Sequence, residues 1–163
     1  MAEASYSNLI LRMTRSFDAT PDRVFAAWTN PEQFGAWFGP KAMHTVECAL
    51  DARVGGAWRL MAEGLDVPGR HQEGRVRPTV SGKYLEVEPP HRLVFTWAWH
   101  EKDDFASPRG QESVVTVLFK AVGERTEMIF TQAVLKDEQS LAAHRRGWTE
   151  SFDKLDDFLR RPA

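Results

Sequence analysis

His144 and Trp148 form the pair of residues whose types and spacing most directly suggest chemistry. They are four residues apart in a stretch with helical periodicity, so both side chains project from one face of a helix. An imidazole can hydrogen-bond the polar end of a bound molecule while an indole covers its apolar body. The alternative is a core histidine that bonds to backbone near the start of its helix, and the spacing leaves both possibilities open.

Further candidates for a binding pocket come from segments that have the period-two pattern of strands. Trp97, Met128 and Gln132 fall on the apolar faces of these segments, and we place them nearer to a pocket than to the packed end of the core. Gln132 forms hydrogen bonds but does not titrate, which argues against proton transfer at that point. Two predicted short helices add Trp28, Trp37 and Phe38. Any single tryptophan is more typical of packing, but six of them predict an apolar cavity.

Several kinds of chemistry lack the residues that they need. The five histidines lie in different predicted elements, and Cys48 is the only cysteine, which excludes a disulfide within the chain and a cysteine-based zinc site. The glycine-containing turn at residues 53–56 leads into a strand rather than a helix, so it does not predict a phosphate loop. Ser81 and Ser113 have no nucleophile elbow around them. We therefore expect no cofactor, no metal and no catalytic residue.

Length and composition indicate an ordinary globular domain. A chain of 163 residues with 42% hydrophobic residues supports one real core. Its 21 basic and 23 acidic residues give a net charge of −2 without charge runs, which argues against nucleic-acid binding. The first residues lack both a signal-peptide core and a membrane-spanning length, so we expect a cytoplasmic protein without membrane insertion.

The elements that must position these residues begin with a strand at residues 7–17, where apolar and polar residues alternate. Thr20 before Pro21 predicts a capped helix start. Asn30 before Pro31 repeats the signal, and Gln33 is placed to complete a capping box. Two short helices therefore follow the first strand.

The pattern then changes to period two, with turn residues between the segments. It predicts antiparallel strands at residues 43–50, 56–63, 74–87 with a break, 92–100, 112–121 and 125–133. Residues 64–79 indicate a long irregular loop or a frayed edge hairpin. Residues 136–160 return to helical period after Asp137, a plausible cap. Gly147 lies inside this helix at a cost of about 1 kcal/mol, which predicts a close approach to a neighbouring element.

This order predicts an α+β fold in a single domain, residues 1–163, with a seven-stranded antiparallel sheet and one long C-terminal helix. A sheet that covers its apolar face with one helix has to curl around it. Because curvature leaves space between sheet and helix, that space is the predicted pocket.

Five ordered runs resemble the activator of heat shock protein 90 ATPase homologue family, a branch of the START-like or SRPBCC superfamily. They read ATPDRVFAAWTNPE (19–32), WFGP (37–40), DARVGG (51–56), YLEVEPPHRLVFTW (84–97) and HRRGW (144–148). The resemblance covers residues 8–160 and implies the helix-grip fold, in which a curved seven-stranded sheet holds a long C-terminal helix around a cavity. Gln132 stands where this family often has a histidine. The resemblance does not fix a function, because one fold hosts many.

We therefore expect a protein that binds a small, largely apolar or aromatic ligand between sheet and helix, with His144 or Gln132 as its polar anchor. The second hypothesis is an enzyme of the cyclase or hydrolase kind in the same cavity, with His144 as acid or base. The third, taken from the family name, is a co-chaperone that contacts a chaperone and stimulates its ATPase. Ligand identity and the choice between monomer and homodimer are not fixed by the sequence.

Overall fold

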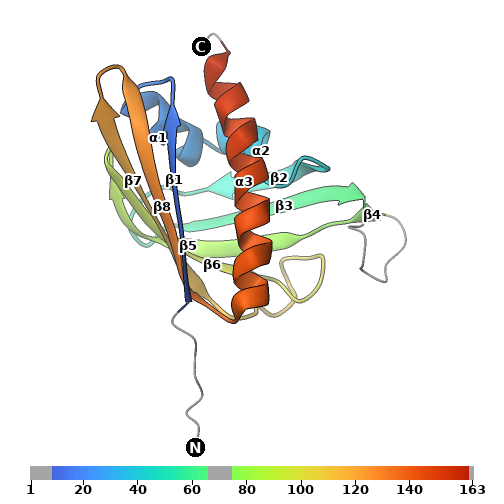
Figure 1. Cartoon of the computed structure of the whole chain (residues 1–163). Helices are drawn as coiled ribbons and strands as arrows, with labels where there is room; N and C mark the ends of the chain where they lie inside the picture. The colour runs from blue at the N-terminus through green and yellow to red at the C-terminus, as the bar shows by residue number, and fades with distance from the viewer. Residues whose placement is uncertain (1–8, 66–74, 162–163) are drawn as a thin grey trace, which may run out of the picture.

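The computed structural model describes residues 9–65 and 75–161 (Figure 1). The helices are α1 (Pro21–Thr29), α2 (Pro31–Trp37) and α3 (Glu138–Arg160). The strands are β1 (Leu9–Phe17), β2 (Met43–Leu50), β3 (Ala57–Leu65), β4 (Arg75–Val76), β5 (Thr79–Glu88), β6 (Arg92–Trp99), β7 (Ser113–Val122) and β8 (Arg125–Leu135). The predicted element order is confirmed.

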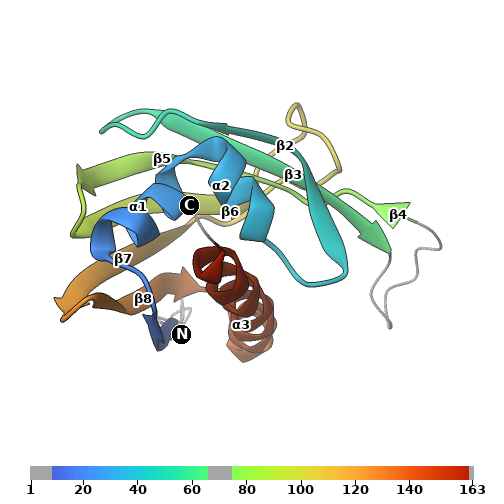
Figure 2. The ribbon, with the colours of Figure 1, turned by 90° about the horizontal axis from the view of Figure 1, so that it is seen from above.

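Seven strands form one antiparallel sheet in the order β1-β8-β7-β6-β5-β3-β2, and the short β4 pairs with β3 beside this path. Figure 2 shows the sheet curling around α3, with α1 and α2 on the same concave side. In Figure 1 the C-terminal end of α3 lies near these two short helices, and its first turns lie near the end of β6. The helix-grip prediction is confirmed. Within the described residues, no helix combines the length and apolar character needed to cross a bilayer.

Both short helices begin at the prolines that the sequence indicates. The side chain of Asn30 accepts a hydrogen bond from the backbone nitrogen of Gln33 at 3.1 Å, which confirms the predicted Asn30 cap of α2. The predicted capping box is not completed, because the Gln33 side-chain oxygen is buried without a hydrogen-bond donor among the described residues. At α1 the Thr20 side chain makes no capping bond, and its backbone carbonyl accepts from Arg23 and Val24 instead. In α3 the Asp137 carboxylate caps the nitrogen of Ser140 at 2.8 Å, as predicted.

The predicted inner faces of the strands are buried. Leu93, Phe95 and Trp97 on β6 are at most 4% exposed, whereas Trp99 at the strand end is 38% exposed. Thr126, Met128, Phe130 and Gln132 on β8 are fully buried. This alternation places large apolar side chains under α3 and leaves one tryptophan at the rim.

The break predicted within residues 74–87 is confirmed, because the segment divides into β4 and β5. Of the two predicted alternatives for residues 64–79, the pairing of Gly64 with Val76 supports the edge hairpin at those residues. Residues 66–74 of that predicted loop, and residues 7–8 of the first predicted strand, lie outside the described residues. The close approach predicted at Gly147 is wrong, because a Cβ added there meets nothing within 4 Å.

Candidate functional site

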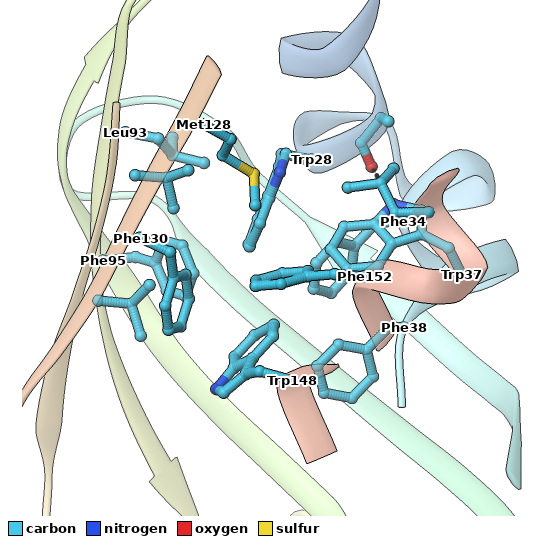
Figure 3. Packing of buried hydrophobic residues seen from close by; sticks show 14 of the residues in the cluster. Trp28, Phe34, Trp37, Phe38, Leu93, Phe95, Met128, Phe130, Trp148 and Phe152 are labelled. Carbon is cyan, nitrogen blue, oxygen red and sulfur yellow. Dashed lines mark hydrogen bonds between the residues drawn. The ribbon is translucent and has the colours of Figure 1, made fainter. Parts of the chain in front are cut away.

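Aromatic rings fill the space between the sheet and α3 (Figure 3). Trp28 from α1 is 1% exposed and stacks on Trp148 of α3 with ring centroids 5.9 Å apart. Phe130 of β8 lies 4.7 Å from the Trp148 ring. Trp37 meets Trp28 edge-on at 4.9 Å. Each ring comes from a different element, so the cluster joins the sheet to all three helices.

The structure brings together seven of the eight residues predicted to bind a ligand. Each of the seven is at most 5% exposed: Trp28, Trp37, Phe38, Trp97, Met128, Gln132 and Trp148. The eighth, His144, is half-buried near the start of α3 beside Trp99. The spacing of four residues does put His144 and Trp148 on one side of the helix, but only Trp148 enters the core.

Beside Trp28 the cluster leaves far less space than the ligand cavity that the sequence predicts. A space of about 10 Å³ is lined by Trp28, Phe34, Leu50, Trp58, Tyr84 and Phe95. That volume holds one water molecule at most. A larger molecule therefore enters only when side chains of the cluster move apart.

Gln132 is held in a chain of buried hydrogen bonds. Its Oε1 accepts from Trp148 Nε1 at 2.9 Å, and its Nε2 donates to Ser113 Oγ at 2.9 Å. Both ends of the amide are thus satisfied inside the protein. In this conformation Gln132 positions the Trp148 ring.

Burial lowers the pKa of His144 from its ordinary value. Its Nδ1 lies 2.8 Å from the carbonyl oxygen of Ser140, an acceptor, so Nδ1 carries the proton. Its Nε2 accepts from the indole Nε1 of Trp99 at 3.3 Å. Both nitrogens are occupied when the ring is neutral, and this link joins the end of β6 to the first turns of α3.

Two indole nitrogens of the cluster have no hydrogen-bond partner. Trp28 Nε1 and Trp97 Nε1 are buried without an acceptor among the described residues. By contrast, Trp37 Nε1 donates to the carbonyl of Ala27 and Trp58 Nε1 to that of Thr96, both at 2.9 Å. An unmade hydrogen bond at a buried donor costs about 1–3 kcal/mol. The sequence gives no sign of this difference, because which indoles find a carbonyl depends on packing.

Comparison with known proteins supports the fold and defines the family. The family described as Activator of Hsp90 ATPase homolog 1-like protein matches residues 18–160. The chain belongs to this family. It lies within the START-like (SRPBCC) superfamily, and no curated protein gives a significant match.

Several solved structures share this AHSA1-like fold. The AHSA1 protein of Silicibacter pomeroyi is 30% identical, with 91% of this chain and 96% of that chain covered and a TM-score of 0.75. A protein from Rhizobium leguminosarum is 26% identical over 96% of this chain and 97% of that chain, with a TM-score of 0.75. One from Rhodobacter sphaeroides is 25% identical over 94% and 93%, with a TM-score of 0.72. The fold typically binds small ligands, and it leaves the specific function unassigned.

In this AHSA1-like chain, α3 also fixes the loop at residues 38–42, which follows α2. The backbone nitrogen of Gly39 donates to Ser151 Oγ at 2.9 Å. Lys154 Nζ donates to the carbonyls of Phe38 at 3.2 Å and Gly39 at 3.3 Å. Because Phe38 packs against Trp148 at 5.7 Å, these polar contacts hold one wall of the aromatic cluster in place. Periodicity of the helix does not predict them.

A second hollow lies on the surface between α2 and the edge strand β2. It measures about 430 Å³, and its lining includes Gly35, Thr45 and Cys48. Burial raises the pKa of Cys48 to about 11, so this thiol is protonated at neutral pH and is a poor nucleophile. Among the described residues, no three His, Cys, Asp or Glu side chains are grouped to hold a metal ion.

Proposed function

We propose that this chain binds a small, largely apolar or aromatic molecule between the curled sheet and α3, in contact with Trp28, Trp97 and Trp148. The observation that carries this proposal is the pair of buried indole N–H groups of Trp28 and Trp97 without an acceptor. Buried polar groups in proteins nearly always have a partner. A ligand with an apolar body and a hydrogen-bond acceptor would supply one, and the AHSA1-like fold typically binds small ligands.

Ligand entry requires part of the cluster to open. The first half of α3 has fewer buried side chains than the second half and is the part that we expect to move. Its side chains Glu138, Gln139, Ala142, Ala143, Arg145 and Arg146 are exposed. Only Leu141, His144 and a few small residues there are partly buried, whereas Trp148, Phe152 and Leu155 further along are buried. Regions with few buried apolar contacts open at low free-energy cost. The ligand would therefore enter past the His144–Trp99 link.

The first test is native mass spectrometry of freshly purified protein beside a denatured sample. We expect an adduct that is released on unfolding. In parallel, titration with the fluorescent probe 8-anilinonaphthalene-1-sulfonate should saturate at one site per chain. Trp97→Phe removes the free indole N–H and keeps an aromatic ring, and it should weaken binding about tenfold, as expected for one hydrogen bond.

Trp58→Phe is the matched control, because its indole N–H already donates to the Thr96 carbonyl and is not free for a ligand. His144→Ala tests the rim, where a loss of about tenfold is expected if the imidazole anchors the polar end. Two results together would contradict the proposal. The first is a native mass without an adduct, and the second is an equal effect of Trp97→Phe and Trp58→Phe on probe binding. Near-UV circular dichroism verifies that each variant is folded.

The family description names activation of a chaperone ATPase, and this is the second candidate function. It requires a protein partner, and it is tested by adding the purified chain to an Hsp90 and measuring ATP hydrolysis. Stimulation that persists in Trp97→Phe would favour this function over ligand binding. A cytoplasmic location would suit either function.

A further inference from the structure

Ser81 and His100 lie side by side on the outer face of the sheet, away from α3. On β5 the side chains of Val80 and Tyr84 are buried in the core, and Ser81, between them in the alternation, faces outward. Ser81 pairs with Ala98 of β6, two residues before His100, so both side chains share this face. The distance from Ser81 Oγ to His100 Nε2 is 2.7 Å.

The other nitrogen of the ring fixes the direction of that hydrogen bond. His100 Nδ1 lies 2.9 Å from the carbonyl oxygen of Ser107, which only accepts, so Nδ1 carries the proton. The lone pair of the neutral ring is then on Nε2, where it accepts the hydroxyl proton of Ser81. This is the arrangement that a general base needs to activate a serine, with a third group orienting the base.

A guanidinium supplies positive charge at the same oxygen. Arg109 Nε donates to Ser81 Oγ at 3.0 Å, and its Nη2 donates to the Ser81 carbonyl at 2.9 Å. Arg109 Nη1 is fixed by Glu112 at 2.9 Å. A cation held at this distance stabilises negative charge that develops on or beside Oγ.

The loop between β6 and β7, drawn in yellow in Figure 1, builds this site over the sheet. A β-bridge joins His100 to Arg109, and the ring of Phe105 meets the His100 ring edge-on at 5.8 Å. Ala98 beneath the loop is fully buried, while Ser81 and His100 are half-buried. The serine is therefore shielded from bulk water without being sealed from a small molecule.

From this geometry we infer that Ser81 is the nucleophile of a second site, which hydrolyses a small neutral carboxylic ester. Ser81 Oγ attacks the ester carbon as its proton passes to His100 Nε2, and the proton then leaves with the departing alcohol. Water, deprotonated by His100, releases the carboxylic acid from the acyl-serine and restores Ser81. Arg109 stabilises the oxyanion in both steps, and Ser107 positions the base.

The charges nearby favour a neutral substrate. Arg109 already pairs with Glu112, and Arg59, which lies 4.6 Å above the Phe105 ring, pairs with Glu47 at 2.7 Å. An anionic substrate would have to compete with these carboxylates. The site shares no side chain with the proposed ligand pocket, so either can fail without the other.

A fluorophosphonate tests the nucleophile directly, because Oγ displaces fluoride and the adduct stays on the serine. Folded wild-type protein should gain one phosphonyl group per chain, mapped to Ser81 by peptide mass spectrometry. His100→Gln cannot take the proton and should slow labelling about a hundredfold, as expected for loss of a general base. Ser81→Ala should remove both the label and the turnover of 4-nitrophenyl acetate.

Ser16→Ala and His91→Gln are matched controls at exposed positions outside both sites, and they should label as the wild type does. A purely structural role for the Ser81–His100 contact would change thermal stability in the variants and leave wild-type Ser81 unlabelled. That result overturns the inference, as does labelling of Ser81 that His100→Gln leaves unchanged. Should His100→Gln fail to fold, labelling of folded wild-type protein at Ser81 still decides the question.

Discussion

The indole Nε1 of Trp99 donates a hydrogen bond to Nε2 of His144, and this 3.3 Å contact links the end of β6 to the start of α3. It exists only when the imidazole is neutral, because a protonated ring has donors on both nitrogens. The two residues are 45 positions apart in the chain. The contact therefore makes the link between β6 and α3 depend on the protonation of His144.

The protein should become less stable as the pH falls, over a range that the pKa of His144 determines. Burial lowers its pKa in the folded protein below the ordinary value of 6.5. As the pH falls, the His144 imidazole is therefore protonated in the unfolded chain at a higher pH than in the folded protein. Stability is lost as the pH falls from about 6.5 through the folded pKa. Urea unfolding from about pH 7.5 to about pH 5.5 should show a shallower pH dependence in His144→Gln than in wild type. His91→Gln, at an exposed position, is the control, and equal slopes in wild type and His144→Gln would contradict the assignment.

Trp97→Phe and Trp58→Phe should differ in stability although they remove the same atoms. Both lose part of a buried ring, but only Trp58 also loses a hydrogen bond, to the Thr96 carbonyl. Trp97→Phe removes a donor without a partner. It should therefore lower the free energy of unfolding less than Trp58→Phe does, by at least about 1 kcal/mol. Urea denaturation at pH 7 measures the difference. Equal losses would mean that the Trp97 N–H has a partner, such as a bound water.

Much of the fold follows from the sequence because its signals are local. Proline after Thr20 and Asn30 fixes both helix starts, and alternation of apolar residues fixes the inner faces of the strands. The clustering of the seven predicted site residues follows in turn, because each lies on the inner face of the sheet, on or just after a short helix, or on the buried side of α3.

The chemistry is harder to predict because it depends on contacts between distant segments. Whether an indole N–H meets a carbonyl, as in Trp58, or none, as in Trp97, depends on side-chain packing. Ser81 on β5 and His100 just after β6 are 19 residues apart, and the orienting carbonyl belongs to a loop. No local motif marks such a group, which is why the sequence predicts no nucleophile there.

Gly147→Ala should stabilise the protein. A Cβ at this position meets nothing within 4 Å, and alanine is better than glycine in a helix interior by about 1 kcal/mol. Gly82→Ala is the contrasting variant, because its Cβ would lie 1.8 Å from the Thr96 carbonyl oxygen. Overpacking of this kind costs about 1–3 kcal/mol. Thermal unfolding should show a higher midpoint for Gly147→Ala and a lower midpoint for Gly82→Ala. A lower midpoint for Gly147→Ala would indicate a close approach that the structure lacks.

Lys154→Met should loosen the loop that carries Phe38. The Lys154 ammonium donates to the carbonyls of Phe38, Gly39 and Met43 at 3.2–3.5 Å, while burial lowers its pKa from the ordinary value. Methionine keeps the apolar stem and loses these bonds, so we expect a loss of about 1–2 kcal/mol. Hydrogen exchange should rise at residues 38–43 in particular, and the rate of probe entry should rise with it, because Phe38 covers Trp148. Lys154→Arg restores a donor and should recover part of the protection, whereas unchanged exchange in Lys154→Met would show that Ser151 and Glu150 hold the loop without the lysine.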